Sequence, residues 1–293
     1  MGTRCAVELW ATDNAAGQAA IEAVLADMRR IDALMSTYKP DSEISRVNAN
    51  AEREAVPVTA ELFGLLQTAQ QYSALSKGAF DITYASVGYL YDYRAHFHPD
   101  QATIAAALPS VDYRQLKLDP VKRTVGFAKP GMRIDLGGIA KGYAVDRGIE
   151  LLKARGFAHA MVNAGGDTRV SGDRFGKPWV VGIRHPDRKE EVALRIPLVD
   201  AAFSTSGDYE RFFDEGGVRY HHIIDPKTGQ SPHAVRSVTI IASNATRTDG
   251  LSKTVFILGP KAGLDFINSL PDADAIVIAA DGKVGYSKGL QPP

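Results

Sequence analysis

Hydrophobic residues recur with helical spacing in the first part of the chain. Residues 15–35 are predicted to form an amphipathic helix, because their apolar side chains fall on one side. The apolar residues of this stretch are Ile21, Val24, Leu25, Met28, Ile31 and Leu34. A strand is predicted before it, over residues 4–10, and a polar loop after it, over residues 36–43. A second helix is predicted from a Thr59 cap to residue 76, with Gly78 at its end.

The segment 133–142 combines an apolar strand, a glycine pair and the start of a helix. Asp135 lies on the predicted strand, and Lys141 lies in the first turn of the predicted helix. Glycines at such a turn let a ligand approach the backbone, and the N–H groups at a helix start favour a phosphate. The segment therefore indicates either a phosphate site with Lys141 as a mobile positive charge, or an ordinary turn. Neither the P-loop motif nor G-x-G-x-x-G is present.

The rest of the chain mixes strands and helices without strict alternation. The helix at Lys141 is predicted to stop at Gly156 and to belong to a βαβ unit that closes with a strand over residues 159–162 and a turn over residues 163–167. Further strands are predicted over residues 179–183, 192–196, 201–205, 220–224 and 238–242. A helix over residues 249–258 and a final helix, strand and hairpin with a turn at residues 281–282 follow. The pattern predicts an α+β fold, a single compact mixed-sheet domain over residues 1–293 that could be two-lobed.

Composition narrows the class of protein. The 293 residues are 45% apolar and 23% charged, as in a globular protein, and the formal net charge is zero. No global field therefore favours nucleic acid as a partner. The single cysteine, Cys5, excludes an internal disulfide and a multi-cysteine metal site. No apolar run approaches the roughly 18 residues of a membrane helix, so no transmembrane segment is expected.

Eight short motifs occur in an order that resembles the FAD:protein FMN transferase family, the ApbE-like flavin transferases. They are residues 1–3, 35–45, 78–83, 134–143, 163–167, 204–209, 221–229 and 249–252. The resemblance implies the mixed-sheet fold of that family and an enzyme that binds FAD and Mg²⁺. Such an enzyme cleaves the FAD pyrophosphate, releases AMP and leaves FMN phosphoester-linked to a threonine of an acceptor protein.

The family resemblance also implies the residues of the site. FAD would contact Met1, Tyr38, Ala79, Phe80, Asp81, Asp135, Lys141 and His222. The metal would be held by the Gly138 carbonyl, Asp249, and the positions of Ser252 and Lys253. Lys141, His222 and Asp249 would carry the catalysis.

Each of these residues also has a purely structural interpretation. Asp249 could simply be a negative charge that stabilises the start of a helix, and Lys141 could be a lysine exposed to solvent on a helix face. Either His221 or His222 could be the titratable group that deprotonates the acceptor threonine. The stretch 204–208 is either a phosphate or acceptor-loop cradle or a polar turn.

Lys253 is a departure from the family, whose members usually carry threonine at this position. Asp249 and Lys253 are i, i+4 neighbours on a helix, so their side chains meet. Lys253 therefore either forms a simple ion pair with Asp249 on the helix or places its ammonium group in part of the cation-binding position.

The partners follow from the resemblance. The chain has no evident acceptor motif of its own, so the expected partner is an acceptor flavoprotein subunit with a target threonine. The alternatives are a metal-dependent FAD pyrophosphatase and a non-catalytic flavin-binding or delivery protein. The resemblance favours a periplasmic or membrane-anchored protein whose leader is absent from this chain, and a cytoplasmic protein is the alternative.

Overall fold

The computed structural model describes residues 2–184, 188 and 191–291, and the α+β prediction is confirmed. The chain divides into two compact units. Unit 1 comprises Met1–Asp32, Ile139–Gly207 and Val235–Pro293. Unit 2 comprises Ala33–Gly138 and Asp208–Ala234.

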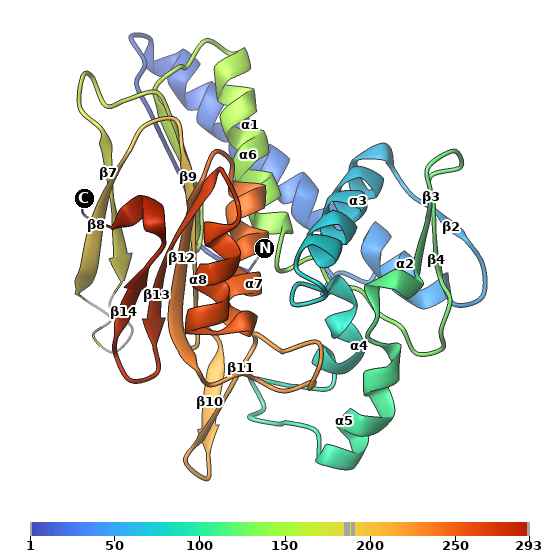
Figure 1. Cartoon of the computed structure of the whole chain (residues 1–293). Coiled ribbons are helices and arrows are strands. Elements are labelled where there is room, and N and C mark those ends of the chain that lie inside the picture. Colours follow the sequence, from blue (N-terminus) through green and yellow to red (C-terminus); the bar gives the residue numbers. More distant parts are fainter. Residues whose placement is uncertain (1, 185–187, 189–190, 292–293) are drawn as a thin grey trace. The chain divides into compact units, whose positions relative to one another are not determined.

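Within the described residues, unit 1 is built on a seven-stranded sheet with the order β1-β5-β6-β9-β12-β13-β14 (Figure 1). The strands are β1 (Cys5–Leu9), β5 (Ala160–Ala164), β6 (Asp167–Ser171), β9 (Ala202–Gly207), β12 (Val235–Ala242), β13 (Ala273–Ala279) and β14 (Val284–Tyr286). Every neighbouring pair is antiparallel. The predicted βαβ unit is therefore wrong, because such a unit requires parallel strands.

Helices cover one face of this sheet. They are α6 (Ala140–Ala154), α7 (Ala245–Leu258) and α8 (Pro260–Asn268), and the long helix α1 (Asn14–Met35) precedes them in the chain. The helix α6 contacts β5 and β6, while α7 contacts β9 and β12 and lies against α6 (Figure 1). A separate antiparallel ribbon, β7 (Trp179–Arg184) and β8 (Val192–Leu198), packs Trp179 against Val170 and Phe203 of the sheet.

Alternation along the strands decides which side chains face α6 and α7. On β9, Phe203 packs with the β7–β8 ribbon, whereas Ser204 and Ser206 contact side chains of α7. On β6, Val170 joins the ribbon core and Asp167 faces the helices. Asp167, Ser204 and Ser206 therefore lie on the face toward the helices, while Val170 and Phe203 lie on the face toward the ribbon.

Unit 2 combines short helices with two small sheets. Its helices are α2 (Glu43–Asn50), α3 (Ala60–Leu75), α4 (Ala85–Gly88) and α5 (Gln101–Ala107). The strands β2 (Val56–Pro57), β4 (Thr124–Phe127) and β3 (Leu116–Asp119) form one sheet in that order, and β10 (Phe212–Glu215) pairs with β11 (Val218–His221). The predicted Thr59 cap of α3 is confirmed, since its side chain accepts a hydrogen bond from the Leu62 N–H at 3.4 Å.

Several predicted elements need correction. Residues 132–136 belong to no strand, so Asp135 does not lie on one. The segment predicted as a polar loop leads into α2, which was missed, as was β10. Asp167 begins β6 rather than ending a turn, and β11 stops at His221.

Two predicted helix limits have opposite outcomes. The helix α7 begins at Ala245, after an Asn244 cap, and so starts four residues before Asp249. The stop of α6 is confirmed, with Arg155 as the C-cap and Gly156 at a φ of 87°. None of the helices in the described residues is both long and apolar enough to cross a membrane.

Candidate functional site

Four charged side chains of unit 1 meet between α6, β6 and α7, and we call them the charged cluster: Lys141, Asp167, Asp249 and Lys253. The Lys141 ammonium lies 2.9 Å from Oδ2 of Asp167 and 3.2 Å from Oδ2 of Asp249. Lys253, one helical turn after Asp249, donates to its Oδ1. The predicted residues Lys141, Asp249 and Lys253 are thus brought together.

The approach of α6 to α7 depends on one glycine. A side chain on Gly142 would place its Cβ 2.1 Å from the carbonyl oxygen of Ala245, the first residue of α7. Because the glycine leaves this space open, its N–H reaches Oδ2 of Asp249 at 3.1 Å. Gly142 therefore couples the position of α7 to that of the cluster.

A second contact fixes the start of α7. The Asp146 carboxylate, on α6, accepts hydrogen bonds from the backbone N–H groups of Ala245 and Thr246, both at 2.8 Å. It also accepts from Arg169 of β6 at 3.1 Å. These bonds satisfy N–H groups that a helix start leaves without internal partners. The role of Asp146 could not be predicted from the sequence, since it depends on a helix far along the chain.

The charges of the cluster are buried to different degrees. The Asp249 side chain is 0% exposed, while those of Lys141 and Lys253 are 24% and 18% exposed. Burial acts to raise the pKa of Asp249, but the two ammonium groups outweigh it and hold the pKa below its ordinary value. Burial acts to lower the pKa of Lys141, but Asp167 and Asp249 outweigh it and raise the pKa. Asp249 is therefore a carboxylate and Lys141 an ammonium.

Asp167 belongs to the cluster although it was assigned no role from the sequence. Burial and the nearby Asp249 charge raise the pKa of Asp167, against the opposing effect of Lys141 and Lys253. It is placed by its register on β6, opposite Ser204 of β9. The 163–167 motif contained the residue, but no local pattern indicates which charges a strand end will face.

Hydroxyl groups lie beside the charged residues. Ser204 and Thr248 share a hydrogen bond of 2.7 Å, and Ser206 and Ser252 share one of 2.8 Å. Ser252 also donates to the backbone oxygen of Asp249 at 2.8 Å. Of the two interpretations of residues 204–208, the polar turn is wrong, because residues 204–207 belong to β9, and the cradle stays a prediction. The Ser204 and Ser206 hydroxyls bond to α7, and that of Thr205 bonds to Thr239 of β12.

The described side chains do not fit a Mg²⁺ site as they stand. Magnesium takes oxygen ligands at about 2.0–2.1 Å in octahedral geometry. No group of three His, Cys, Asp or Glu residues in the described part of the chain could hold a metal ion. Asp249 contributes one carboxylate, and that carboxylate already accepts from two ammonium groups and a backbone N–H. Gly138 lies in the turn before α6, and its role as a ligand stays a prediction.

In unit 2, the Asp135 carboxylate accepts hydrogen bonds from three nearby residues. Its carboxylate accepts from Thr37 Oγ1 and from the Gly137 N–H, both at 2.7 Å, and from the Tyr84 hydroxyl at 3.3 Å. It therefore caps the turn that leads toward α6. Tyr38 is 85% exposed, so it is not a core aromatic and its ring is available to a ligand.

The segment 79–81 is buried. Phe80 packs edge-on against Tyr72, with ring centroids 6.1 Å apart. Asp81 accepts from the Thr83 N–H at 2.8 Å and the Tyr113 N–H at 2.9 Å, and burial raises its pKa despite these bonds. Ala79 is buried as well, so these side chains serve local structure and their contact with FAD stays a prediction.

The two adjacent histidines differ. His221 is buried, its Nε2 bonds to the Pro232 oxygen at 2.8 Å, and burial lowers its pKa to about 4. His222 follows β11 and is only partly buried, so its predicted placement on a strand with Tyr220 is wrong. His221 is thus a neutral structural residue, and His222 stays the candidate for proton transfer. Met1 lies outside the described residues.

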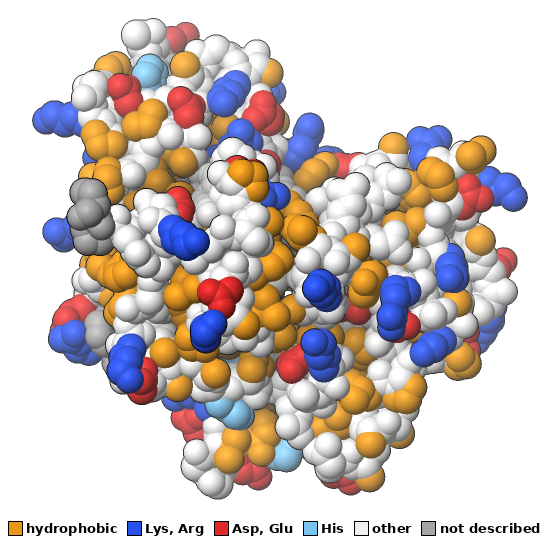
Figure 2. Space-filling view, viewed as in Figure 1, with side chains coloured by type: hydrophobic (Ala, Val, Ile, Leu, Met, Phe, Trp, Pro, Cys, Tyr) orange, Lys and Arg blue, Asp and Glu red, His pale blue; other side chains and the backbone are white. Residues whose placement is uncertain are grey.

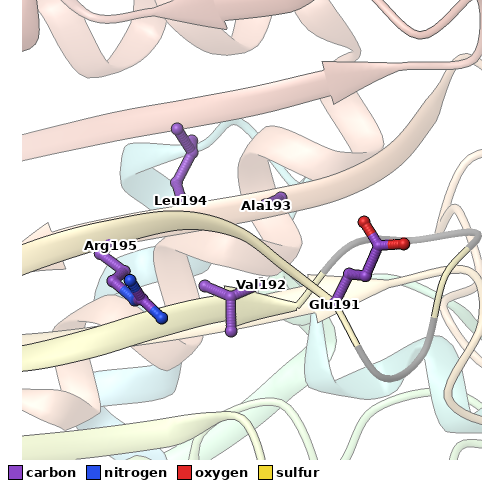
Figure 3. A pocket seen from close by; sticks show the side chains of 5 residues that line it. All are labelled: Glu191, Val192, Ala193, Leu194 and Arg195. Carbon is purple, nitrogen blue, oxygen red and sulfur yellow. The ribbon is translucent and has the colours of Figure 1, made fainter.

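A shallow hollow elsewhere on unit 1 is distinct from this cluster. It is lined by residues 191–195 of β8 and the turn before it, and Figure 3 shows Glu191 and Arg195 at its two ends. No member of the charged cluster lines it. On the face in Figure 2, Lys and Arg are interspersed with Asp and Glu, as the zero net charge indicates.

Comparison with known proteins assigns the chain to one class of enzyme. The chain belongs to the ApbE family, whose model matches residues 1–277. The FAD:protein FMN transferase of Treponema pallidum is 34% identical, with 99% of this chain and 85% of that protein covered. The one from Haemophilus influenzae is also 34% identical, with 89% and 78% covered. The chain is accordingly a transferase.

Solved structures agree. The ApbE protein of Thermotoga maritima has a TM-score of 0.91 and 35% identity, with 98% of this chain and 94% of that chain covered. The flavinyl transferase ApbE of Pseudomonas stutzeri, in its apo form, has a TM-score of 0.86 and 30% identity, with 98% and 92% covered.

Proposed function

We propose that this transferase moves FMN from FAD to a threonine hydroxyl of an acceptor protein. The threonine oxygen attacks the phosphorus on the FMN side of the pyrophosphate, and a phosphoester forms. The bond from that phosphorus to the bridging oxygen breaks, and AMP leaves with the electron pair. The names of the relatives, FAD:protein FMN transferase, support this reaction.

The charged cluster is the observation that carries the proposal. Phosphoryl transfer needs positive charge beside the non-bridging oxygens and a fixed geometry more than it needs covalent chemistry. Lys141 is held by two buried carboxylates, so its ammonium is fixed and charged. We assign to Lys141 the stabilisation of phosphate charge, and to Asp249 the positioning of Lys141. His222 is the proposed acceptor of the threonine proton.

Magnesium enters this proposal only as the cation that the family resemblance implies. No step is assigned to magnesium, because in this chain the Lys253 ammonium already binds the Asp249 carboxylate. An extracytoplasmic location remains a proposal that fractionation of cells would test.

The test uses FAD and a protein that the Haemophilus influenzae relative flavinylates. Release of AMP together with flavin fluorescence on the acceptor band after denaturing electrophoresis is expected. Free FMN without a fluorescent band would make the chain a pyrophosphatase, and absence of AMP would make it a flavin-binding protein. Either result overturns the proposal.

A matched pair of variants shows whether the cluster is responsible. Asp249→Asn keeps the shape and removes the charge that holds Lys141, so AMP release should fall at least about a hundredfold. Asp265→Asn changes a carboxylate that is also paired with a lysine, but on the exposed surface of α8. It should leave the rate unchanged.

A further inference from the structure

We propose that the Lys253 ammonium takes the place of a divalent cation at Asp249, so that this transferase carries a built-in cation. The inference rests on the proposed function for its catalytic meaning, but its physical content is a statement about metal binding. It predicts that the wild-type protein does not bind Mg²⁺ at Asp249.

The ion pair between Lys253 and Asp249 is largely buried. Lys253 and Asp249 have the i, i+4 spacing of an ordinary surface ion pair, yet the Asp249 side chain is 0% exposed and that of Lys253 only 18%. The pair Lys261–Asp265 on α8 has the same spacing, and its side chains are 92% and 63% exposed. Lys253 is therefore directed into the protein, whereas Lys261 lies on the surface.

Both oxygens of the Asp249 carboxylate already accept hydrogen bonds. A carboxylate has about four lone-pair sites on its two oxygens. Within the described residues, Oδ1 accepts from Lys253 and lies 3.3 Å from the Lys141 nitrogen. Oδ2 accepts from Lys141 at 3.2 Å and from the Gly142 N–H at 3.1 Å. A metal ion would have to displace one of these donors, and Lys253 is the one on a flexible side chain.

The net charge of the charged cluster also disfavours a divalent ion at Asp249. The cluster contains two carboxylates and two ammonium groups, so it is neutral as it stands. A divalent ion at Asp249 would face two ammonium groups within a few ångström and would be strongly repelled. The Ser252 hydroxyl, beside Lys253, is already bonded to Ser206 and to the Asp249 backbone. With Lys253 also donating to it at 3.4 Å, this hydroxyl oxygen is already engaged and is not open to a metal ion.

The test compares metal binding by the full-length protein in the absence of flavin. Mn²⁺ binding followed by electron paramagnetic resonance, and Mg²⁺ binding by calorimetry, report on the site without requiring turnover. Lys253→Thr removes the ammonium and adds an oxygen ligand, so it should bind either ion at least about tenfold more tightly than wild type. Lys253→Met removes only the charge and should show a smaller gain.

Two further variants separate charge from folding. Lys253→Arg keeps a cation and should not gain metal affinity, and Lys261→Met should match wild type. Circular dichroism confirms that each variant is folded, and Lys253→Met still tests the inference if the threonine variant is not. Saturable Mg²⁺ binding by wild type that is the same in Lys253→Thr and Lys253→Met would overturn the inference.

A final measurement separates this inference from the proposed function. AMP release from FAD and acceptor is followed with EDTA and with added Mg²⁺. Wild type should keep most of its rate in EDTA, while Lys253→Thr should need Mg²⁺. If wild type released no AMP in either condition, the proposed function would fail and the metal-binding results would still decide the role of Lys253. Complete loss of wild-type activity in EDTA, restored by Mg²⁺, would refute the built-in cation.

Discussion

Substitution of Gly142 by alanine tests the close approach of α6 and α7 directly. The added Cβ would lie 2.1 Å from the Ala245 oxygen, 2.6 Å from its carbonyl carbon and 2.9 Å from Cβ of Asp249. Two of these atoms belong to the backbone, so no side-chain rotation relieves the clash. The two helices must separate by on the order of 1 Å before the contacts become normal.

The magnitude follows from the contacts that such a separation breaks. Overpacking of this kind costs about 1–3 kcal/mol. The bond from the Gly142 N–H to the charged Asp249 carboxylate, 3.1 Å long, is lost or weakened at a further cost of about 1.5–3 kcal/mol. These losses are partly offset because alanine is more favourable than glycine inside a helix by about 1 kcal/mol. The net loss is roughly 1.5–5 kcal/mol. Since the unfolding entropy of a 293-residue chain is about 0.6 kcal/mol/K, the melting temperature should fall by roughly 2–8 °C.

Calorimetric melting, with AMP release as a second readout, is the assay. Gly64→Ala is the matched control, because Gly64 lies inside α3 and its added Cβ would meet no atom within 4 Å. That variant should be equally or slightly more stable than wild type, by up to about 1 kcal/mol. If Gly142→Ala melted at or above the wild-type temperature, the described spacing of α6 and α7 would be wrong.

Three further predictions follow from other contacts. Asp146→Ala should lower the free energy of unfolding in urea by about 2 kcal/mol, because it removes the acceptor of the first two N–H groups of α7, and an unchanged midpoint would contradict that role. FAD should bind much more tightly than FMN in calorimetry if the exposed Tyr38 contacts adenine, so equal affinities would argue against that assignment. Burial lowers the pKa of His221 to about 4, below the ordinary value of about 6.5. As the pH falls, His221 therefore takes up a proton in the unfolded chain before it does so in the folded protein. Stability is therefore complete above about pH 6.5 and declines toward pH 4 by up to about 3 kcal/mol. His221→Gln should flatten this decline in pH-dependent urea titrations, whereas His96→Asn, at an exposed position, should not.

Elements with local signals were predictable from the sequence. The helices α3 and α6 are flanked by local signals, the cap Thr59 directly before the first and Gly156 just after the second. The strand predicted at Asp135 failed for a nonlocal reason. The Ile134 backbone bonds at 2.8 and 2.9 Å to the side-chain amide of Asn48, which takes the place of a neighbouring strand. An apolar pattern indicates burial, but it does not identify the hydrogen-bond partner.

The candidate site was predictable to the extent that its residues are neighbours in sequence. The contact of Asp249 with Lys253 follows from helical spacing alone, and the structure contains it. The role of Asp167 could not be predicted, because it depends on the pairing of β6 with β9. The choice between His221 and His222 also required the structure, since only the fold decides which ring turns inward.

The division of unit 1 into three separate stretches of chain has a consequence for synthesis on the ribosome. Lys141 emerges 108 residues before Asp249, its partner on α7. Until the stretch Val235–Pro293 has been made, β12 is absent and β9 remains an uncovered strand edge with Phe203 beside it. Such an edge is a template for pairing with other chains. The nascent protein is therefore most exposed to aggregation between completion of β9 and arrival of β12, and a chain truncated before residue 235 would stay in that state.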